Sequence, residues 1–90
     1  MDFKAQGKNY HMYSVKDELT GRFLNPIFME TDPEAIRWFK YVLNTTDMWK
    51  SNAAMYSLYK LGDFNDMQGL GDYPITELIQ NGVGVLEKGE

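Results

Sequence analysis

The sequence TDPEAIRWFKYVL, residues 31–43, decides the fold because a complete helix start is followed there by an apolar stripe. Thr31 or Asp32 supplies the side-chain oxygen of an N-cap, and Pro33 suits the first helical turn. The acidic residues beside the proline favour a helix N-terminus. We therefore predict a helix from about Asp32 to Leu43.

The apolar positions of this helix recur with a period of about 3.6 residues and fall on one side. Those that we expect to pack on a sheet are Ala35, Ile36, Phe39, Val42 and Leu43, with Trp38 at the border. Those that we expect to face solvent are Glu34, Arg37, Lys40 and Tyr41.

Segments rich in β-branched and aromatic residues flank the helix. Residues 9–16 and 23–30 enclose a polar turn that contains glycine, which predicts a hairpin. Pro26 has no backbone N–H, so the second strand is expected at a sheet edge or bulged. Residues 55–61 predict a third strand, followed by a turn. The predicted fold class is α+β: a small antiparallel sheet, made of a β-hairpin and a third strand, with the main α-helix packed on one face.

The remaining segments carry weaker signals. We expect an ordered loop at residues 44–54, and either a short helix or an extended edge at residues 74–80. The predicted organisation is a flexible N-terminus (1–8), a single α+β domain (9–72) and an acidic C-terminal segment that is partly ordered (73–90).

The composition indicates one globular domain that is not crosslinked. The chain has 90 residues, 43% of them hydrophobic and none of them cysteine, so disulfides and thiolate metal sites are excluded. The first eight residues lack the pattern of a signal peptide, and no apolar run approaches the length of a membrane span. We expect a protein of the cytoplasm without a membrane partner.

The charge is distributed unevenly. Residues 1–60 carry eight Lys and Arg against seven Asp and Glu, whereas residues 61–90 carry one lysine against six carboxylates. An acidic final third is usually a solvated surface. The alternative is an electrostatic role, either contact with a basic partner or a weakened hold on polyanions.

Patterns of catalysis and metal binding are absent from the sequence. His11 is the single histidine and cysteine is missing, so neither a nucleophile–histidine relay nor a zinc site is supported. The run Asp63–Gly69 resembles a calcium loop. Its fifth position, however, is Met67 where the loop needs an oxygen ligand, and its sixth is Gln68 where the loop needs glycine. Asp63 and Asp66 are expected to form a turn rather than an acid–base pair. We expect no enzyme activity, no cofactor and no metal.

Aromatic and basic residues interleave in the helix and just after it. Single-stranded nucleic acid is held by stacking faces together with cations that neutralise phosphates. The candidate nucleic-acid-binding residues are Arg37, Lys40 and Lys50 as phosphate contacts and Trp38, Tyr41 and Trp49 as stacking faces. The alternative is that these aromatic residues belong to the core or its border, as aromatics at helical spacing more often do.

Four stretches carry a resemblance to a known family. They are Tyr13–Asp17, Pro26–Phe28, Glu34–Phe39 (EAIRWF) and Tyr56–Asp66 (YSLYKLGDFND). Over about residues 10–70 the chain resembles the small non-structural protein of gokushoviruses, which are single-stranded DNA bacteriophages of the microvirus group (Microviridae). None of the four stretches is a catalytic motif.

The resemblance implies a DNA-binding protein that helps to move the infected cell from double-stranded replication to single-strand synthesis and packaging. Arg37 lies inside a matching stretch and suits a phosphate contact. The isoelectric point of about 4.9 departs from the basic character of strong DNA binders, so the binding expected is weak.

Two hypotheses about function follow. The first is a phage non-structural accessory protein, active in viral genome replication or in single-stranded DNA synthesis and packaging, that binds single-stranded DNA weakly. We expect it to be a homo-oligomer, since an edge strand around Pro26 favours self-association and repeated sites add avidity. The second is an adaptor that docks on a phage or host replication protein through its acidic C-terminal part, without contacting DNA.

Overall fold

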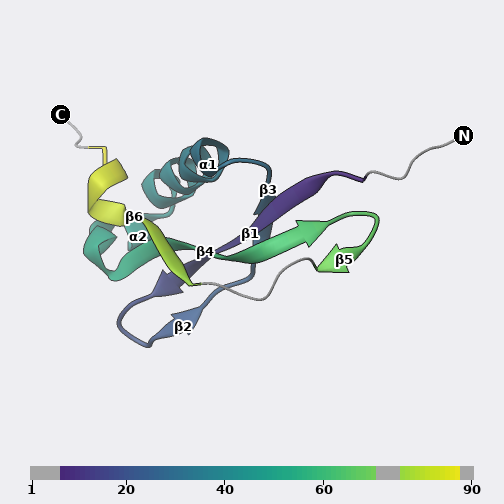
Figure 1. The fold of residues 1–90 in the computed structure, drawn as a ribbon. Helices are drawn as coiled ribbons and strands as arrows, with labels where there is room; N and C mark the ends of the chain where they lie inside the picture. Colours follow the sequence, from purple (N-terminus) through teal and green to yellow (C-terminus); the bar gives the residue numbers. More distant parts are fainter. Residues whose placement is uncertain (1–6, 71–75, 88–90) are drawn as a thin grey trace, which may run out of the picture.

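The computed structural model describes residues 7–70 and 76–87 of the chain. The predictions for the flexible N-terminus (1–8) and the acidic C-terminal segment (73–90) therefore lie partly outside the described residues. Within these ranges the chain forms six strands, two α-helices and two 3-10 helices (Figure 1). None of the helices that the structure describes is long and apolar enough to cross a membrane.

Helix α1 spans Asp32–Thr45 and begins where the sequence predicts. The Thr31 hydroxyl accepts a hydrogen bond from the Glu34 N–H, and the Glu34 carboxylate accepts one from the Thr31 N–H. This reciprocal capping box satisfies two of the N–H groups that a helix start leaves open. The predicted apolar stripe is confirmed, because its central members are fully buried: Ala35, Phe39 and Leu43.

The loop predicted for residues 44–54 is wrong. The chain there forms a short helix, α2 (Asp47–Ser51), and a 3-10 helix, η1 (Ala53–Met55). The Trp49 ring stacks on the Tyr56 ring, with 4.7 Å between the ring centroids, and so ties these turns to the core. No helical period is visible in the sequence because each turn is too short to repeat one.

All strand pairings among the described residues are antiparallel, and β1 (Asn9–Asp17) and β4 (Tyr56–Asn65) lie side by side at the centre of the sheet (Figure 1). These two strands pair over their whole length. The outer side of β1 pairs with β2 (Arg22–Phe23) and β3 (Ile27–Met29). The outer side of β4 pairs with β5 (Gly69–Leu70) and β6 (Glu77–Asn81). Each edge of the sheet is thus divided between two short strands.

The predicted hairpin is confirmed, but its second strand is divided into β2 and β3. The division falls at Leu24–Pro26, where the proline cannot donate a hydrogen bond to β1. The Leu24 N–H still donates to the Val15 carbonyl at 2.8 Å, so the connection stays close to β1. The expectation that this strand lies at a sheet edge is confirmed, since β2 and β3 both lie on the outer side of β1.

Two predictions for the second half of the chain need comment. The turn expected directly after residue 61 is wrong, because β4 continues to Asn65 by pairing with the first half of β1. Asp63 is therefore a strand residue and not a turn former. At residues 77–81 the extended edge is found, as β6, and the short helix is not.

A β-bulge interrupts the central ladder at Leu61. Met12 lies opposite Gly62 and Tyr13 lies opposite Lys60, so Leu61 is an additional residue of β4 that has no partner on β1. From the bulge onward, each residue of β4 faces the side of the sheet opposite to the one that simple alternation would give it.

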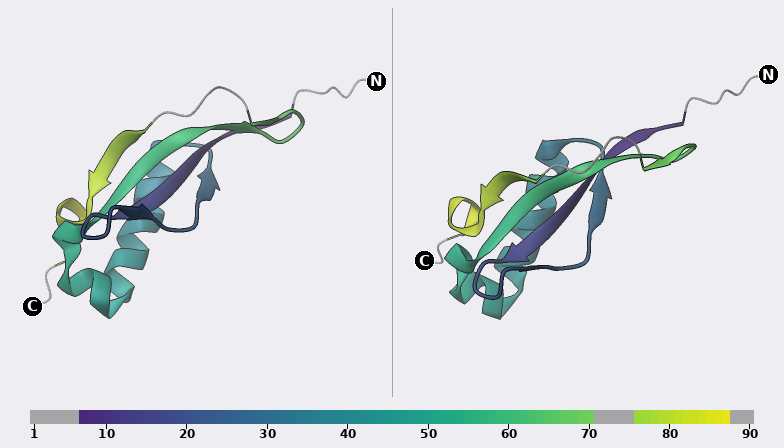
Figure 2. Two further views of the ribbon diagram at one scale, coloured as in Figure 1. Left: turned by 90° about the horizontal axis from the view of Figure 1, so that it is seen from below. Right: turned by 60° about the horizontal axis from the view of Figure 1, so that its bottom comes forward.

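The helices cover one face of the sheet, and the core lies between the two layers (Figure 2). Its buried members from the sheet are Tyr13, Val15, Tyr56 and Leu58, which pack with the α1 stripe and Ala53. The 3-10 helix η2 (Gly82–Val85) completes the helical layer beside α1. Gly82 is required there, because a Cβ atom would lie 2.3 Å from the Ala53 carbonyl oxygen.

The residues after η2 are fastened to α1 by one amide side chain. Asn44 Nδ2 donates to the Val85 carbonyl at 3.0 Å, and Asn44 Oδ1 accepts from the Glu87 N–H at 2.8 Å. Residues 77–87 are consequently joined both to the sheet and to the main helix.

Candidate functional site

The outer side of α1 holds three of the sequence-predicted site residues. Arg37, Lys40 and Tyr41 are exposed, and Tyr41 is 68% exposed. Lys40 Nζ lies 3.6 Å from a carboxylate oxygen of Glu87, so a phosphate at this position competes with an acidic side chain. The structure brings these three residues together on one helix.

The two tryptophans lie nearer the core, Trp38 on α1 and Trp49 on α2. Trp38 and Trp49 are both half-buried and pack against the core. One face of the Trp49 ring is covered by Tyr56, at an interplanar angle of 15°. Lys50 is half-buried on α2. The predicted set is therefore divided between three exposed residues on α1 and three half-buried residues, of which the two tryptophans pack against the core.

The sheet has a second face, which carries more aromatic surface than α1 does. Side chains alternate along a strand, and Tyr13 and Val15 point to the helical layer, so Tyr10, Met12, Ser14 and Lys16 point away from it. The residues opposite them continue this face on the neighbouring strands. We call it the open face and define it by its principal side chains: Tyr10, Lys16, Phe23, Phe28, Tyr59 and Phe64.

The open face is not covered by the helices that the structure describes. In Figure 2 helices α1 and α2 lie on the other side of the sheet. Phe23 is 39% exposed and Phe28 is 43% exposed, and Leu78, opposite Tyr59 at the other edge of the sheet, is 55% exposed. Large apolar side chains left in water on a sheet face commonly mark an interaction surface.

One group of rings lies at the β5 end of the open face. The Phe64 ring centroid is 6.4 Å from that of Tyr10 and 5.1 Å from that of Phe28, both in tilted arrangements. These three residues come from β1, β3 and β4. We call them the Phe64 cluster.

A second group lies at the other end of the open face. The Phe23 and Tyr59 rings meet edge to face with their centroids 5.5 Å apart, and Lys16 Nζ lies 5.6 Å from each centroid. This is the distance range of a cation–π contact. We call these three residues the Tyr59 cluster. Because Tyr10 and Lys16 are six residues apart on one strand, the two clusters are roughly 20 Å apart.

Each cluster is accompanied by a lysine and a carboxylate in contact. Beside the Phe64 cluster, Lys8 Nζ lies 2.9 Å from Glu30 Oε2, and the hydrogen bond and charge of Glu30 raise the pKa of Lys8. Beside the Tyr59 cluster, Lys16 Nζ lies 3.9 Å from Glu18 Oε1. Glu18 also accepts a hydrogen bond from the Tyr59 hydroxyl at 3.1 Å, and burial together with this bond raises the pKa of Tyr59.

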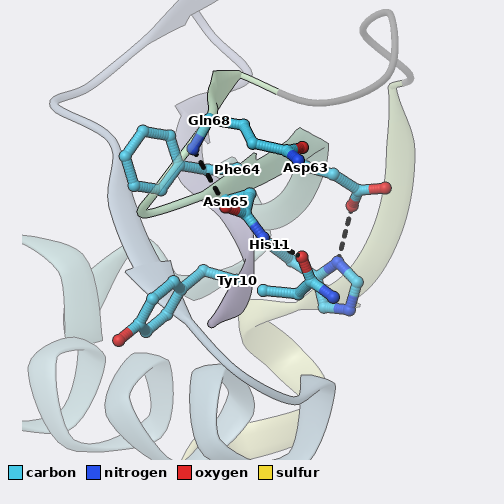
Figure 3. Close-up of a pocket in the computed structure, with 7 residues that line it drawn as sticks. Tyr10, His11, Asp63, Phe64, Asn65 and Gln68 are labelled. Carbon is cyan, nitrogen blue, oxygen red and sulfur yellow. Dashed lines mark hydrogen bonds and ion pairs between the residues drawn. The ribbon is translucent and has the colours of Figure 1, made fainter. Parts of the chain in front are cut away.

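A cleft of about 330 Å³ lies at the β5 end of the central ladder (Figure 3). Figure 3 shows the Tyr10 and Phe64 rings on one side of it and the His11–Asp63 pair on the other. The remaining lining residues are polar: Asn9, Asn65 and Gln68. The cleft thus extends the Phe64 cluster around the end of the sheet.

The polar groups on the helical side form a structural network. His11 Nδ1 and Asp63 Oδ1 are hydrogen-bonded at 2.7 Å, the Tyr13 hydroxyl donates to Asp32 at 2.5 Å, and Lys60 Nζ lies 3.2 Å from the same Asp32 oxygen. The Tyr13 hydrogen bond, helped by Lys60, holds the pKa of Asp32 below its usual range against the effect of burial. Burial and the bond to Asp32 raise the pKa of Tyr13.

This network joins the start of α1 to both central strands. Within the described residues, no group of three or more His, Asp or Glu side chains is placed to hold a metal ion.

The sequence prediction missed the open face because it looked for aromatics at helical spacing. The alternation Tyr10-x-Met12-x-Ser14-x-Lys16 was the available signal on β1. On β4 the corresponding signal is hidden, since Tyr59 and Phe64 are five residues apart and simple alternation places them on opposite faces. The bulge at Leu61 brings both rings to the open face.

The fold and this surface define a class: a small α+β protein with one helical layer and an open, aromatic sheet face. The chain belongs to the phage ORF5 protein family, whose model matches residues 10–85. That match confirms the prediction of a phage protein, and it extends past the predicted resemblance to include β6 and η2. The gokushovirus assignment and DNA binding stay predictions. No curated protein and no solved structure matches the chain.

Proposed function

We propose that this protein binds single-stranded DNA weakly through the open face, as a non-structural accessory factor in phage genome replication or in single-strand synthesis and packaging. It acts by binding and not by catalysis. The observation that carries the proposal is the presence of five aromatic rings, from four strands, on the sheet face opposite α1.

Stacking explains why these rings suit an unpaired strand. Every base has a flat face that can lie on an aromatic side chain, and stacking contributes about 1–3 kcal/mol per base. A four-stranded sheet with aromatics on its central strands and helices behind it is a known platform for unpaired nucleotides. Here Tyr10, Tyr59 and Phe64 hold the central positions. A duplex keeps its base faces covered, so the proposal is specific for single strands.

The charge of the molecule supports weak binding. Lys16 lies within the Tyr59 cluster and can reach a phosphate beside a stacked base. The net charge of −4 opposes the approach of any polyanion. Affinity on this surface therefore depends on the number of bases stacked and not on a basic patch.

Replacing ring faces on the open face tests the proposal. Phe64→Leu and Tyr10→Leu keep the apolar volume but remove a stacking face, so each should weaken binding of a fluorescein-labelled deoxyoligonucleotide by about tenfold, measured by anisotropy. The matched control is Tyr41→Leu, which removes an exposed ring from α1. Equal affinity of parent and both open-face variants, with a loss in Tyr41→Leu, would contradict the proposal.

Tryptophan emission gives an independent reading of the same question. Trp38 and Trp49 both pack on the helical side of the sheet. An oligonucleotide bound to the open face should leave the tryptophan emission unchanged while anisotropy reports binding. Quenching of the emission by the oligonucleotide would instead place it on α1 and α2.

The adaptor hypothesis predicts docking through the acidic C-terminal part, and exposed apolar side chains on the helical segments offer a further contact surface for it. Met48, Met55 and Val83 are exposed on α2, η1 and η2, at 64%, 41% and 57% respectively. Methionine side chains adapt well to protein partners. If no single-stranded oligonucleotide binds at any salt concentration, docking on a phage or host replication protein becomes the preferred function.

A further inference from the structure

We propose that Glu18 and Glu30 are specificity residues of the open face, which hold Lys16 and Lys8 beside its two clusters in ion pairs and thereby make binding dependent on stacking and nearly independent of salt. The inference rests on the proposed function, because it concerns how the same surface selects a single strand over a duplex.

The geometry places one carboxylate against the lysine beside each cluster. Lys16, at the Tyr59 cluster, has Glu18 within 3.9 Å, and Lys8, beside the Phe64 cluster, has Glu30 within 2.9 Å. Glu18 is held from a second direction by the Tyr59 hydroxyl. The carboxylate is therefore fixed at the rim of the ring on which a base would stack.

Paired lysines change the electrostatics of DNA binding. A free lysine that neutralises a phosphate releases a condensed counterion, and this release makes affinity fall with salt, with a log–log slope of about −0.7 per contact on a single strand. A lysine that is already neutralised by glutamate releases none, because the phosphate only takes the place of the carboxylate. The expected slope for the parent is therefore close to zero.

The same pairs oppose a duplex. Duplex DNA presents its phosphates and covers its base faces, so it gains nothing from the two clusters and meets two carboxylates at their rims. An unpaired strand can lay its bases on the rings and turn its phosphates outward. Glu18 and Glu30 thus penalise the ligand that binds by charge alone.

Glu18→Gln and Glu30→Gln test the inference, singly and together. Glutamine keeps the size of the side chain, and its carbonyl still accepts the Tyr59 hydrogen bond, while the paired lysine becomes available. The double variant should bind a single-stranded oligonucleotide more tightly at low salt and should acquire a slope of about −1.4, the value for two contacts. Its affinity for a duplex of the same sequence should rise by a larger factor.

The matched control is Glu87→Gln, which frees Lys40 on α1 in the same way. Affinity and slope should stay at the parent values, because α1 lies on the other side of the sheet. Thermal melts of all variants check folding, and Glu30→Gln alone remains informative if Glu18→Gln does not fold.

The outcomes separate the two proposals. A parent that binds with a steep slope, unchanged in the double variant, overturns the role of Glu18 and Glu30 while the open face remains a binding surface. A gain confined to Glu87→Gln overturns both, because it moves the site to α1. Absence of binding in the parent and in every variant also overturns both. Binding by the double variant alone overturns both as well, because the freed lysines and not the rings would then carry the binding.

Discussion

At the scale of single residues, Asp32 combines three constraints. It lies in the first turn of α1, where a negative charge is favoured by the helix dipole. It also accepts a hydrogen bond from Tyr13 and contacts the Lys60 ammonium group. These partners are all lost on unfolding, so the pKa of Asp32 is lower in the folded protein than in the unfolded chain.

Asp32→Asn should therefore reduce stability in a manner that depends on pH. A depressed folded pKa contributes stability that is fully present above the unfolded value of about 3.9 and is lost as the pH falls through the folded value. The difference between parent and variant in the free energy of unfolding should be constant near neutral pH and should shrink below about pH 4. Urea denaturation at several pH values measures it. A difference that is the same at neutral and strongly acidic pH would contradict the shifted pKa.

At the scale of elements, α1 and the β1–β2/β3 hairpin could be predicted from sequence because their signals are local. The capping residues and the apolar stripe of α1 lie within one stretch, and the hairpin is marked by a turn between two β-prone runs. The end of β4 could not be predicted, since Gly62 and Asp63 resemble a turn until the pairing with β1 is known. Pairing partners are a property of the whole sheet.

The site was harder to predict than the fold. Arg37 and Tyr41 were correctly expected to be exposed, but exposure on a helix does not distinguish a binding surface from a solvated one. The open face depends on the bulge at Leu61, which no sequence pattern indicates. Because Leu61 has no partner on β1, the side chains of Tyr59 and Phe64 lie on the same face of the sheet.

Reversing the charges on α1 tests whether the helix or the sheet binds the oligonucleotide. Arg37→Glu together with Lys40→Glu should leave oligonucleotide affinity and its salt dependence within about twofold of the parent, because the open face does not use these residues. Solvent-facing substitutions usually change stability by only about half a kcal/mol, so the fold should persist. Loss of binding in this double variant, measured by anisotropy, would restore the helix as the nucleic-acid interface.

At the scale of the whole molecule, the free edges of the sheet bear on self-association. Strand β6 (Glu77–Asn81) is the longest edge strand among the described residues, and its outer side has no strand partner there. A chain of 90 residues buries a modest share of its surface, so added burial at an edge is favourable.

We expect a homodimer in solution. Light scattering should return about twice the chain mass of 10.4 kDa at high concentration. A mass of one chain across the whole working range would contradict the expectation. A dimer has two open faces. Once one face has bound a DNA strand, the second face is held near the same strand at a high effective concentration, so the dimer binds more tightly than one chain does.

The central ladder also determines how quickly the native state is reached. Strands β1 and β4 lie on either side of α1 in the sequence, so the chain must close a long loop around the helix before Asp17 meets Tyr56. The barrier to folding should be concentrated in this encounter. Substitutions in the ladder should then slow refolding, whereas those in β6 and η2, which join a finished ladder, should mainly accelerate unfolding.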